Sequence, residues 1–269
     1  MKTNYSTKEG RMKLKDQTAL VTGASRGIGE AIARALAAEG AHIAITGRSK
    51  AELETLQEEL GGMGIRCESI VADLTEKGAV EKVWIQATKA FGPIDILVNN
   101  AGMGSSAKPM PVVDYDDAFW ETLVYVNLTV PYLFSKKALP SMIARKYGRI
   151  IMTASVNSKI GLLHGAAYAA SKHGLLGLVR TLAIETAKEG ITVNAICPGP
   201  VRTRMNNLRV EYEAKRLGKS VAEFETDLTP IGRRLEPKEV APLVVYLAGR
   251  EASVITGQAF NIDGGFLMI

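Results

Sequence analysis

The chain has 269 residues, of which 46% are hydrophobic and 23% charged, and a formal net charge of +5 at pH 7. This composition matches an ordinary globular protein that buries a large core. Because the positive charge is spread along the sequence and no apolar run reaches about 18 residues, we expect neither a nucleic-acid partner nor a membrane span.

The first stretch of the chain, Met1–Lys15, is polar and has no apolar segment of the kind found in signal peptides. We expect residues 1–12 to form a frayed or surface-laid arm, with Met12 as an alternative start. No linker rich in Pro, Gly or Ser divides the remaining residues. We therefore expect residues 13–269 to form a single domain.

Seven short apolar runs, many of them β-branched, predict strands at Thr18–Thr22, Ala41–Thr46, Ile65–Val71, Ile94–Val98, Arg149–Thr153, Ile191–Ile196 and Ala259–Ile262. Between the runs lie segments of helical length and composition, namely Ile28–Glu39, Lys50–Leu60, Lys77–Phe91, Phe119–Arg145, Ala166–Glu189 and Pro237–Leu247. Alternation of strand and helix indicates parallel strands joined by crossover helices.

The strands IDILV and GRIIM are almost wholly apolar, which is typical of a sheet covered on both faces. We predict an α/β protein of the Rossmann type, with a doubly wound parallel sheet of about seven strands and helices on both faces. A barrel of eight strand–helix units is the structural alternative. The strand count and the glycine turn described next favour the open sheet.

A glycine-rich turn, TGASRGIG, follows the first predicted strand and opens the first helix, with glycines at Gly23, Gly27 and Gly29. Glycine permits a sharp turn and a close approach to a ligand, and the amides at a helix N-terminus attract a pyrophosphate. The spacing differs from the commonest dinucleotide fingerprint, G-x-G-x-x-G. Its place between strand and helix predicts a dinucleotide site.

The end of the second predicted strand reads AHIAITGRSK, with Gly47 and Arg48 where an NAD site usually offers a carboxylate. A carboxylate repels a 2′-phosphate, whereas guanidinium groups bind it. We therefore expect Arg26 and Arg48 to bind NADP(H). The alternative is that both arginines are ordinary solvated surface residues.

Tyr168 and Lys172 stand four residues apart in YAASK, about one turn of a predicted helix. Their side chains therefore leave the same face and can meet. An ammonium near a phenol lowers the pKa of the phenol toward the working range, which suits proton transfer. The alternative is a lysine stem that merely covers the ring on a surface helix.

Several motifs stand in one order along the chain: TGASRGIG, NNAG (Asn99–Gly102), Asn127 in YVNLT, Ser155 in TASVN, YAASK, and CPGPVRT (Cys197–Thr203). Together they resemble the short-chain dehydrogenase/reductase family from about Lys13 to the C-terminus. The resemblance is closest to the members that act as 3-oxoacyl-(acyl-carrier-protein) reductases.

The resemblance implies four catalytic residues. Tyr168 is the proton donor and acceptor, and Lys172 holds the nicotinamide ribose and lowers the pKa of the tyrosine. Ser155 orients the substrate carbonyl, and Asn127 anchors a water in a proton relay. The open alternatives are that Asn127 caps or kinks its helix and that Ser155 simply ends a strand.

The resemblance also implies a cofactor groove. Within it, Asp73 contacts the adenine, Asn99 lines the groove, and Val201 and Thr203 meet the nicotinamide carboxamide; alternatively, Asp73 caps the helix that follows it. The full predicted set is Gly23, Ser25, Arg26, Gly27, Ile28, Gly29, Arg48, Asp73, Leu74, Asn99, Ala101, Gly102, Tyr168, Lys172, Pro198, Gly199, Val201 and Thr203.

The function implied is an NADP(H)-dependent oxidoreductase that interconverts a ketone and a secondary alcohol, with a 3-oxoacyl thioester as a candidate substrate. The loop after NNAG is longer than in the acyl reductases, so another small carbonyl compound (a sugar, steroid, cyclic ketone or hydroxy acid) stays open. A non-catalytic NADP(H)-binding scaffold is the alternative class, because a fold alone does not establish activity.

Residues 202–229 are rich in helix formers and charges, as expected of a mobile substrate lid. The segment holds six basic residues that suit an acyl-carrier or CoA phosphate: Arg202, Arg204, Arg209, Lys215, Arg216 and Lys219. Five acids lie among them, which favours a solvated amphipathic lid: Glu211, Glu213, Glu223, Glu225 and Asp227. His164 is a further candidate for the pocket wall.

The surplus apolar surface on Phe119–Arg145 and Ala166–Glu189 predicts a homotetramer, as is usual in the family. Two separated cysteines, Cys67 and Cys197, form no CxxC pair and favour a reducing, cytoplasmic location without disulfides. The three histidines lack metal-binding neighbours, so we expect no metal.

Overall fold

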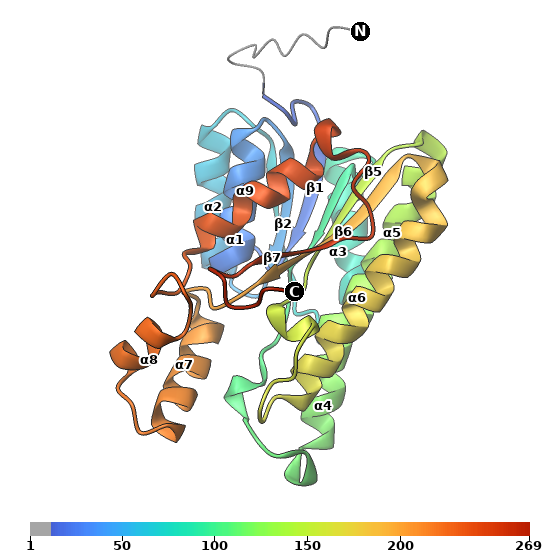
Figure 1. Ribbon diagram of the computed structural model, residues 1–269. Helices are drawn as coiled ribbons and strands as arrows, with labels where there is room; N and C mark the ends of the chain where they lie inside the picture. Colours follow the sequence, from blue (N-terminus) through green and yellow to red (C-terminus); the bar gives the residue numbers. More distant parts are fainter. Residues whose placement is uncertain (1–11) are drawn as a thin grey trace, which may run out of the picture.

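The computed structural model describes residues 12–269. The predicted N-terminal arm, residues 1–12, therefore lies outside the described residues apart from Met12. One seven-stranded sheet organises the rest of the chain, with all of its strand pairs parallel and the order β3-β2-β1-β4-β5-β6-β7. Helices cover both faces of this sheet (Figure 1). The predicted doubly wound Rossmann-type fold is confirmed.

The strands agree closely with the apolar runs of the sequence. They are β1 (Thr18–Thr22), β2 (His42–Gly47), β3 (Cys67–Val71), β4 (Ile96–Asn99), β5 (Gly148–Thr153), β6 (Ile191–Pro198) and β7 (Ala259–Ile262). The first and last have the predicted bounds. The others differ by one or two residues at their ends, where hydrogen bonding and not hydrophobicity decides the boundary.

The helices between the strands are α1 (Gly27–Ala38), α2 (Lys50–Gly62), α3 (Ala79–Phe91), α4 (Asp117–Val124), α5 (Val130–Arg145), α6 (Ala166–Thr186), α7 (Arg204–Arg216), α8 (Val221–Asp227) and α9 (Pro237–Ala248). Buried residues of α1, α2 and α9 pack on one face of the sheet, and those of α3, α5 and α6 on the other. Successive residues of each strand point to opposite faces of the sheet, so the strands contribute apolar side chains to a core on each face.

The long helix predicted over Phe119–Arg145 is not continuous. A π-helical turn, Tyr125–Thr129, separates α4 from α5. Such turns insert one extra residue and frequently occur at functional sites. The turn contains Asn127, and its apolar pattern continues through both flanking helices, which explains why hydrophobic periodicity did not reveal it.

The strand order reverses direction between β1 and β4, so their crossover connections leave in opposite directions. Ligands of open α/β sheets bind in the crevice outside the carboxyl ends of the strands at such a point. The glycine turn follows β1, NNAG ends β4, Ser155 follows β5, and the CPGPVRT motif ends β6. Parallel strands therefore bring these motifs to one edge of the sheet. Helices α7 and α8 lie side by side beyond this edge (Figure 1).

Candidate active site

The glycine turn is packed against the end of β4 with no room for side chains. A Cβ atom on Gly23 would lie 2.7 Å from the Ala101 Cα atom, and one on Gly29 would lie 2.3 Å from the Gly23 carbonyl oxygen. Gly23 and Gly27 also have φ angles of +65° and +63°, which only glycine adopts readily. The backbone of the turn is therefore bare at the helix N-terminus, as an approaching pyrophosphate requires.

Asn100, which the sequence reasoning did not select, fixes this turn. Its Nδ2 atom donates to the carbonyl oxygens of Thr22 and Gly23 at 3.0 and 3.1 Å, and its Oδ1 atom accepts from Thr153 Oγ1 at 3.2 Å. The Thr22 hydroxyl accepts from the Asn100 and Ala101 amides at 3.0 Å each. In the sequence, the second asparagine of NNAG was the feature that could have indicated a residue that holds the glycine turn.

The first asparagine of that motif, Asn99, which was predicted to line the cofactor groove, has a buried side chain. The residue is 2% exposed, and its Nδ2 atom donates to Ser135 on α5 at 3.4 Å. Successive residues of a strand point to opposite faces, so only one of the two asparagines can face the glycine turn. Asn99 can offer a cofactor only its backbone.

A cavity of about 520 Å³ opens beyond the end of β2 and β3 and is lined by Arg48 and Asp73, as the prediction of an adenosine site requires. The Asp73 carboxylate accepts from the amide and the hydroxyl of Thr75 at 3.0 and 2.9 Å, so it also caps the turn that follows. Lys77 and Lys82 line the same cavity and were not selected from the sequence. Leu74, 7% exposed, packs into the core instead of toward the groove.

The two predicted phosphate-binding arginines differ in their surroundings. Arg26, at the N-terminus of α1, forms an ion pair with Glu52 of α2 at 3.0 Å. Arg48 forms no ion pair with any residue of the described range 12–269. Ser25 lies beside the end of β2, since a Cβ atom on Gly47 would come within 3.1 Å of its Oγ atom. Of the two arginines, Arg48 is therefore the one whose charge no ion pair within the described residues neutralises.

Tyr168 and Ser155 meet at the start of α6. A hydrogen bond between their side chains lowers the pKa of the phenol, but burial has the larger effect and raises it, and the nearby Cys197 raises it further. The Ser155 Oγ atom also accepts from the Asn157 amide at 3.1 Å, which fixes the position of the hydroxyl. The pair therefore presents a protonated phenol and a second hydroxyl donor together.

Lys172 lies one turn further along α6, is only 4% exposed, and donates from Nζ to the Thr153 carbonyl oxygen at 2.7 Å. Burial lowers its pKa to about 8. The lower Tyr168 pKa that was expected beside this ammonium is not found, because burial of the phenol raises its pKa. The residues are nevertheless close, with Nζ 5.8 Å from the centre of the Tyr168 ring.

Asn127 faces the same space from the π-helical turn. Its Nδ2 atom donates to the Met103 carbonyl at 2.9 Å and to Ser171 Oγ at 3.1 Å, while its Oδ1 atom accepts from the Met103 amide at 2.7 Å. A Cβ atom on Gly102 would lie 3.2 Å from Asn127 Oδ1 and 3.7 Å from Lys172 Nζ. The bare backbone of Gly102 therefore separates the amide from the ammonium.

The CPGPVRT motif at the end of β6 packs against Asp263 and against the glycine turn. Gly199 approaches Asp263 so closely that a Cβ atom would lie 2.7 Å from the Asp263 Cβ, and Val201 is 2% exposed within the core. Thr203 caps α7 by accepting from the Asn206 amide at 3.2 Å, and its methyl group lies beside Gly27. Of the predicted residues here, Pro198 and Val201 are buried, whereas Gly199 and Thr203 are partly exposed.

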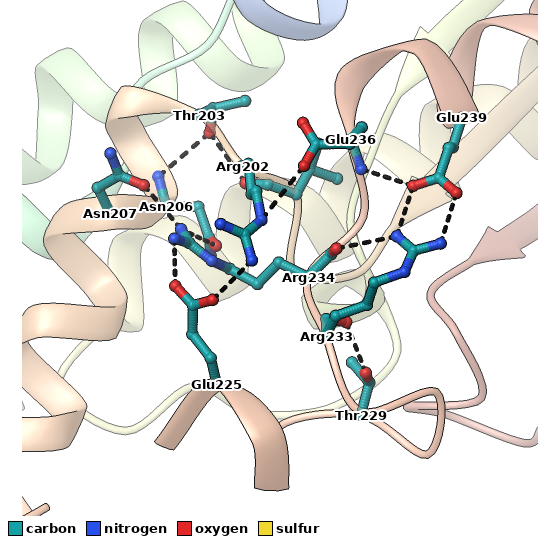
Figure 2. A network of polar contacts seen from close by, with 11 residues as sticks. Arg202, Thr203, Asn206, Asn207, Glu225, Thr229, Arg233, Arg234, Glu236 and Glu239 are labelled. Atoms are coloured by element: carbon teal, nitrogen blue, oxygen red, sulfur yellow. Dashed lines mark hydrogen bonds and ion pairs between the residues drawn. The ribbon is translucent and has the colours of Figure 1, made fainter. Parts of the chain in front are cut away.

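Charged side chains hold the base of residues 202–229, the segment predicted to be a lid. Arg234, 6% exposed, donates to Asn207 Oδ1 at 2.7 Å and pairs with Glu225, which also accepts from Arg202 at 2.9 Å (Figure 2). Arg209 and Arg216 both pair with Glu213, and Lys219 pairs with Asp227. The acids of this segment thus pair with most of its cations, which leaves few of them available to bind a phosphate.

Among residues 12–269, no helix is long and apolar enough to cross a membrane. The same residues contain no cluster of three or more His, Cys, Asp or Glu side chains arranged to hold a metal ion. Both cysteines, Cys67 and Cys197, are free thiols.

Residues 23–267 match the family model described as enoyl-(acyl carrier protein) reductase. The chain is 37% identical to D-beta-hydroxybutyrate dehydrogenase of Cupriavidus necator, over 94% of this chain and 99% of that protein. It is 41% identical to the oxidoreductase UcpA of Escherichia coli, over 94% and 95% of the two chains.

Among solved structures, a variant of actinorhodin polyketide ketoreductase with NADPH superposes with a TM-score of 0.86 at 38% identity, over 93% of this chain and 97% of that one. The match to the family model, residues 23–267, includes the glycines of the turn, the Ser155–Tyr168–Lys172 cluster and residues 202–229. With this coverage and this geometry, the chain belongs to the short-chain dehydrogenase/reductase family.

Proposed function

We propose that this protein is a ketoreductase that uses NADPH to reduce the keto group of a 3-oxoacyl compound, with Tyr168 as the proton donor. Family membership makes the chain an NADP(H)-dependent oxidoreductase that interconverts ketones and alcohols. The observation that supports the assignment most directly is the convergence of Ser155, Tyr168 and Lys172 at the edge of the sheet beside the bare backbone of Gly102.

The glycine turn fits a dinucleotide. Its close-packed glycines leave free amides for the pyrophosphate, Arg48 offers an uncompensated charge for a 2′-phosphate, and the cavity at Asp73 accepts an adenosine. When bound, NADPH supplies the hydride that adds to the carbonyl carbon. The relative with actinorhodin ketoreductase activity was solved with NADPH, which supports the same cofactor here.

In the proposed reaction, Tyr168 donates its phenolic proton to the substrate oxygen as that oxygen gains negative charge. Burial keeps the phenol protonated at neutral pH, so it is a ready acid in the direction of reduction. Ser155 donates a hydrogen bond to the same oxygen from a position fixed by the Asn157 amide. The Lys172 ammonium stabilises the phenolate that remains and, as the family resemblance implies, holds the nicotinamide ribose.

The keto group of the 3-oxoacyl assignment is supported by the polyketide ketoreductase neighbour, and the acyl chain by the acyl-carrier-protein substrate in the description of the family model. A small hydroxy acid is the second candidate, favoured by the D-beta-hydroxybutyrate dehydrogenase relative. The two are separated by steady-state kinetics with NADPH on 3-oxoacyl thioesters and on the matching free 3-oxo acids, followed at the absorbance band of the reduced cofactor. We expect the higher kcat/KM on the thioesters; a preference for the free acids would establish the second candidate instead.

We further propose a homotetramer built on α5 and α6. Tyr132, Ile143 and Ile184 are 43%, 39% and 82% exposed on these helices, which is a large apolar area for a solvated face. Light scattering at micromolar concentration tests the assembly, and a monomer would refute it.

The free thiols agree with a reducing cytoplasm as the proposed location.

A further inference from the structure

We propose that His164, Arg209 and Tyr212 form a latch that fastens the lid helix α7 to the loop leading into the catalytic helix α6. The three residues are called the latch below. They would act as positioning residues that hold the lid over the substrate. The inference rests on the proposed function, because the lid matters only where a substrate binds beneath it.

Three contacts join the two segments. The His164 Nδ1 atom forms a hydrogen bond with the Tyr212 hydroxyl, and the two rings meet edge to face with their centres 6.1 Å apart. The Arg209 Nη2 atom donates to the Leu163 carbonyl oxygen at 2.9 Å. The Arg209 guanidinium also lies 5.4 Å from the centre of the Tyr212 ring, which joins the two lid residues to each other.

The backbone of His164 indicates that these contacts are specific. Its φ angle is +54°, a left-handed conformation that costs free energy for a residue with a Cβ atom. Such conformations persist where surrounding contacts determine them. In the latch, the left-handed turn directs the imidazole away from its own loop and onto Tyr212 of the lid.

Glu213 keeps Arg209 in place within the lid. It pairs with Arg209 on one side and with Arg216 on the other, at 2.8 Å for the second pair. Arg209 is only 15% exposed, so its stem and charge are held close to the protein surface. The donor that reaches Leu163 is therefore preorganised before the lid closes.

The latch residue His164 lies close in sequence to the catalytic Tyr168. His164 precedes Tyr168 by four residues, and Gly165 between them is the N-cap of α6. The lid touches a second wall of the site as well, since a Cβ atom on Gly104 would lie 2.7 Å from Met205 Cγ. Opening α7 must break both contacts, so the latch couples access to the site with the position of the segment before Tyr168.

The decisive variant is Tyr212→Phe, which removes one hydroxyl and keeps the ring against Arg209. The matched control is Tyr246→Phe on α9, which is 40% exposed and takes no part in the latch. We expect Tyr212→Phe to raise KM for the carbonyl substrate about three- to tenfold, the range of one net hydrogen bond, with the Kd for NADPH unchanged. The control should behave as the parent protein.

A second measurement does not depend on turnover. Trypsin cuts after Lys and Arg, and the lid carries several of them, so the rate of cleavage within residues 202–219 reports how often the lid is open. We expect Tyr212→Phe to be cut about three- to tenfold faster than Tyr246→Phe at equal Tm. Equal cleavage rates would overturn the latch, even if the protein reduces ketones. Faster cleavage in a protein that reduces no ketone would support the latch and reject the proposed function.

A double-mutant cycle tests whether His164 and Tyr212 act as a pair. His164→Asn removes the imidazole and keeps a residue that tolerates the left-handed backbone. If the hydrogen bond is the link, the double variant should be cut no faster than either single variant. Multiplied effects on the cleavage rate would show that the two residues act independently and would end the proposal.

Discussion

Lys172 lies one turn of α6 after Tyr168, with its Nζ atom 5.8 Å from the centre of the phenol ring and 2.7 Å from the Thr153 carbonyl oxygen. The ammonium is thus held between the last residue of β5 and the catalytic phenol. Lys172 is buried and Tyr168 is half-buried, and the loss of hydration disfavours the charged form of each group.

Tyr168→Phe should abolish turnover while leaving NADPH binding intact. The change removes the acidic proton and little else, and general acid catalysis of this kind contributes about 10²- to 10⁴-fold. Single-turnover kinetics and NADPH fluorescence titration measure the two effects separately. Ser155→Ala is the companion variant and should retain more activity, since it removes a hydrogen bond and not the proton. Undiminished activity in Tyr168→Phe would remove the assigned role.

The pH dependence of ketone reduction should follow the protonation state of Lys172. The pKa of Tyr168 is raised above its ordinary value of about 10, so the phenol stays protonated through neutral pH, whereas the pKa of Lys172 is lowered to about 8. We therefore expect kcat/KM for ketone reduction to be constant below about pH 8 and to fall above it, as the ammonium is lost. A profile that stays flat to about pH 10 would show that this charge is not needed.

Lys172→Met should stabilise the free protein at neutral pH although it removes a catalytic group. The folded state lowers the pKa from 10.5 to about 8, so the unfolded chain binds the proton more tightly between these values. The cost of burying the charge is full below about pH 8, on the order of 3 kcal/mol, and disappears as the pH rises toward 10.5. Denaturant unfolding at three pH values measures it; a variant that is destabilised at neutral pH would contradict the argument.

Cofactor selectivity should depend more on Arg48 than on Arg26, because only Arg26 is paired with Glu52. We expect Arg48→Ala to lower the ratio of kcat/KM for NADPH over NADH by about 10- to 100-fold, the range of a hydrogen bond to a charged group. Glu52→Gln releases Arg26 and should raise the same ratio. An unchanged ratio in Arg48→Ala would show that other cations of the cavity, such as Lys77, bind the 2′-phosphate.

Gly29→Ala should impair both folding and NADPH binding. The new Cβ atom would lie 2.3 Å from the Gly23 carbonyl oxygen and 2.4 Å from Asn100 Nδ2, so the turn must shift at a cost of about 1–3 kcal/mol. The control is Gly61→Ala in α2, where a Cβ atom meets nothing within 4 Å and should stabilise the helix slightly. Thermal unfolding and NADPH titration compare the two; equal effects would refute the packing argument.

Hydrophobic pattern was sufficient to predict the layers of this fold. The strands Thr18–Thr22 and Ala259–Ile262 appeared at their observed bounds because an apolar run between polar turns is what a parallel sheet buries. The break at Tyr125–Thr129 was not predicted, since a π-helical turn leaves the apolar pattern of its helix unchanged.

Side-chain direction was the weaker part of the sequence reasoning at the site. The residue types and their spacing were enough to select Ser155, Tyr168 and Lys172, but not to tell Asn99 from Asn100, which face opposite sides of one strand end. The pKa of Tyr168 was expected to be lowered by a neighbouring charge, and burial, which depends on the whole surrounding fold, decided otherwise.

The sequence by itself determined the order of strands and helices, the family, and the identity of the groups available for proton transfer and phosphate binding, because these depend on local periodicity and on residue type. Only the tertiary structure decided which charges stay free. The pairing of Arg26 with Glu52, that of Arg202 with Glu225 and the contact of His164 with Tyr212 all join residues far apart in the chain. Such contacts depend on distances in space, which the packing of the sheet and its helices sets.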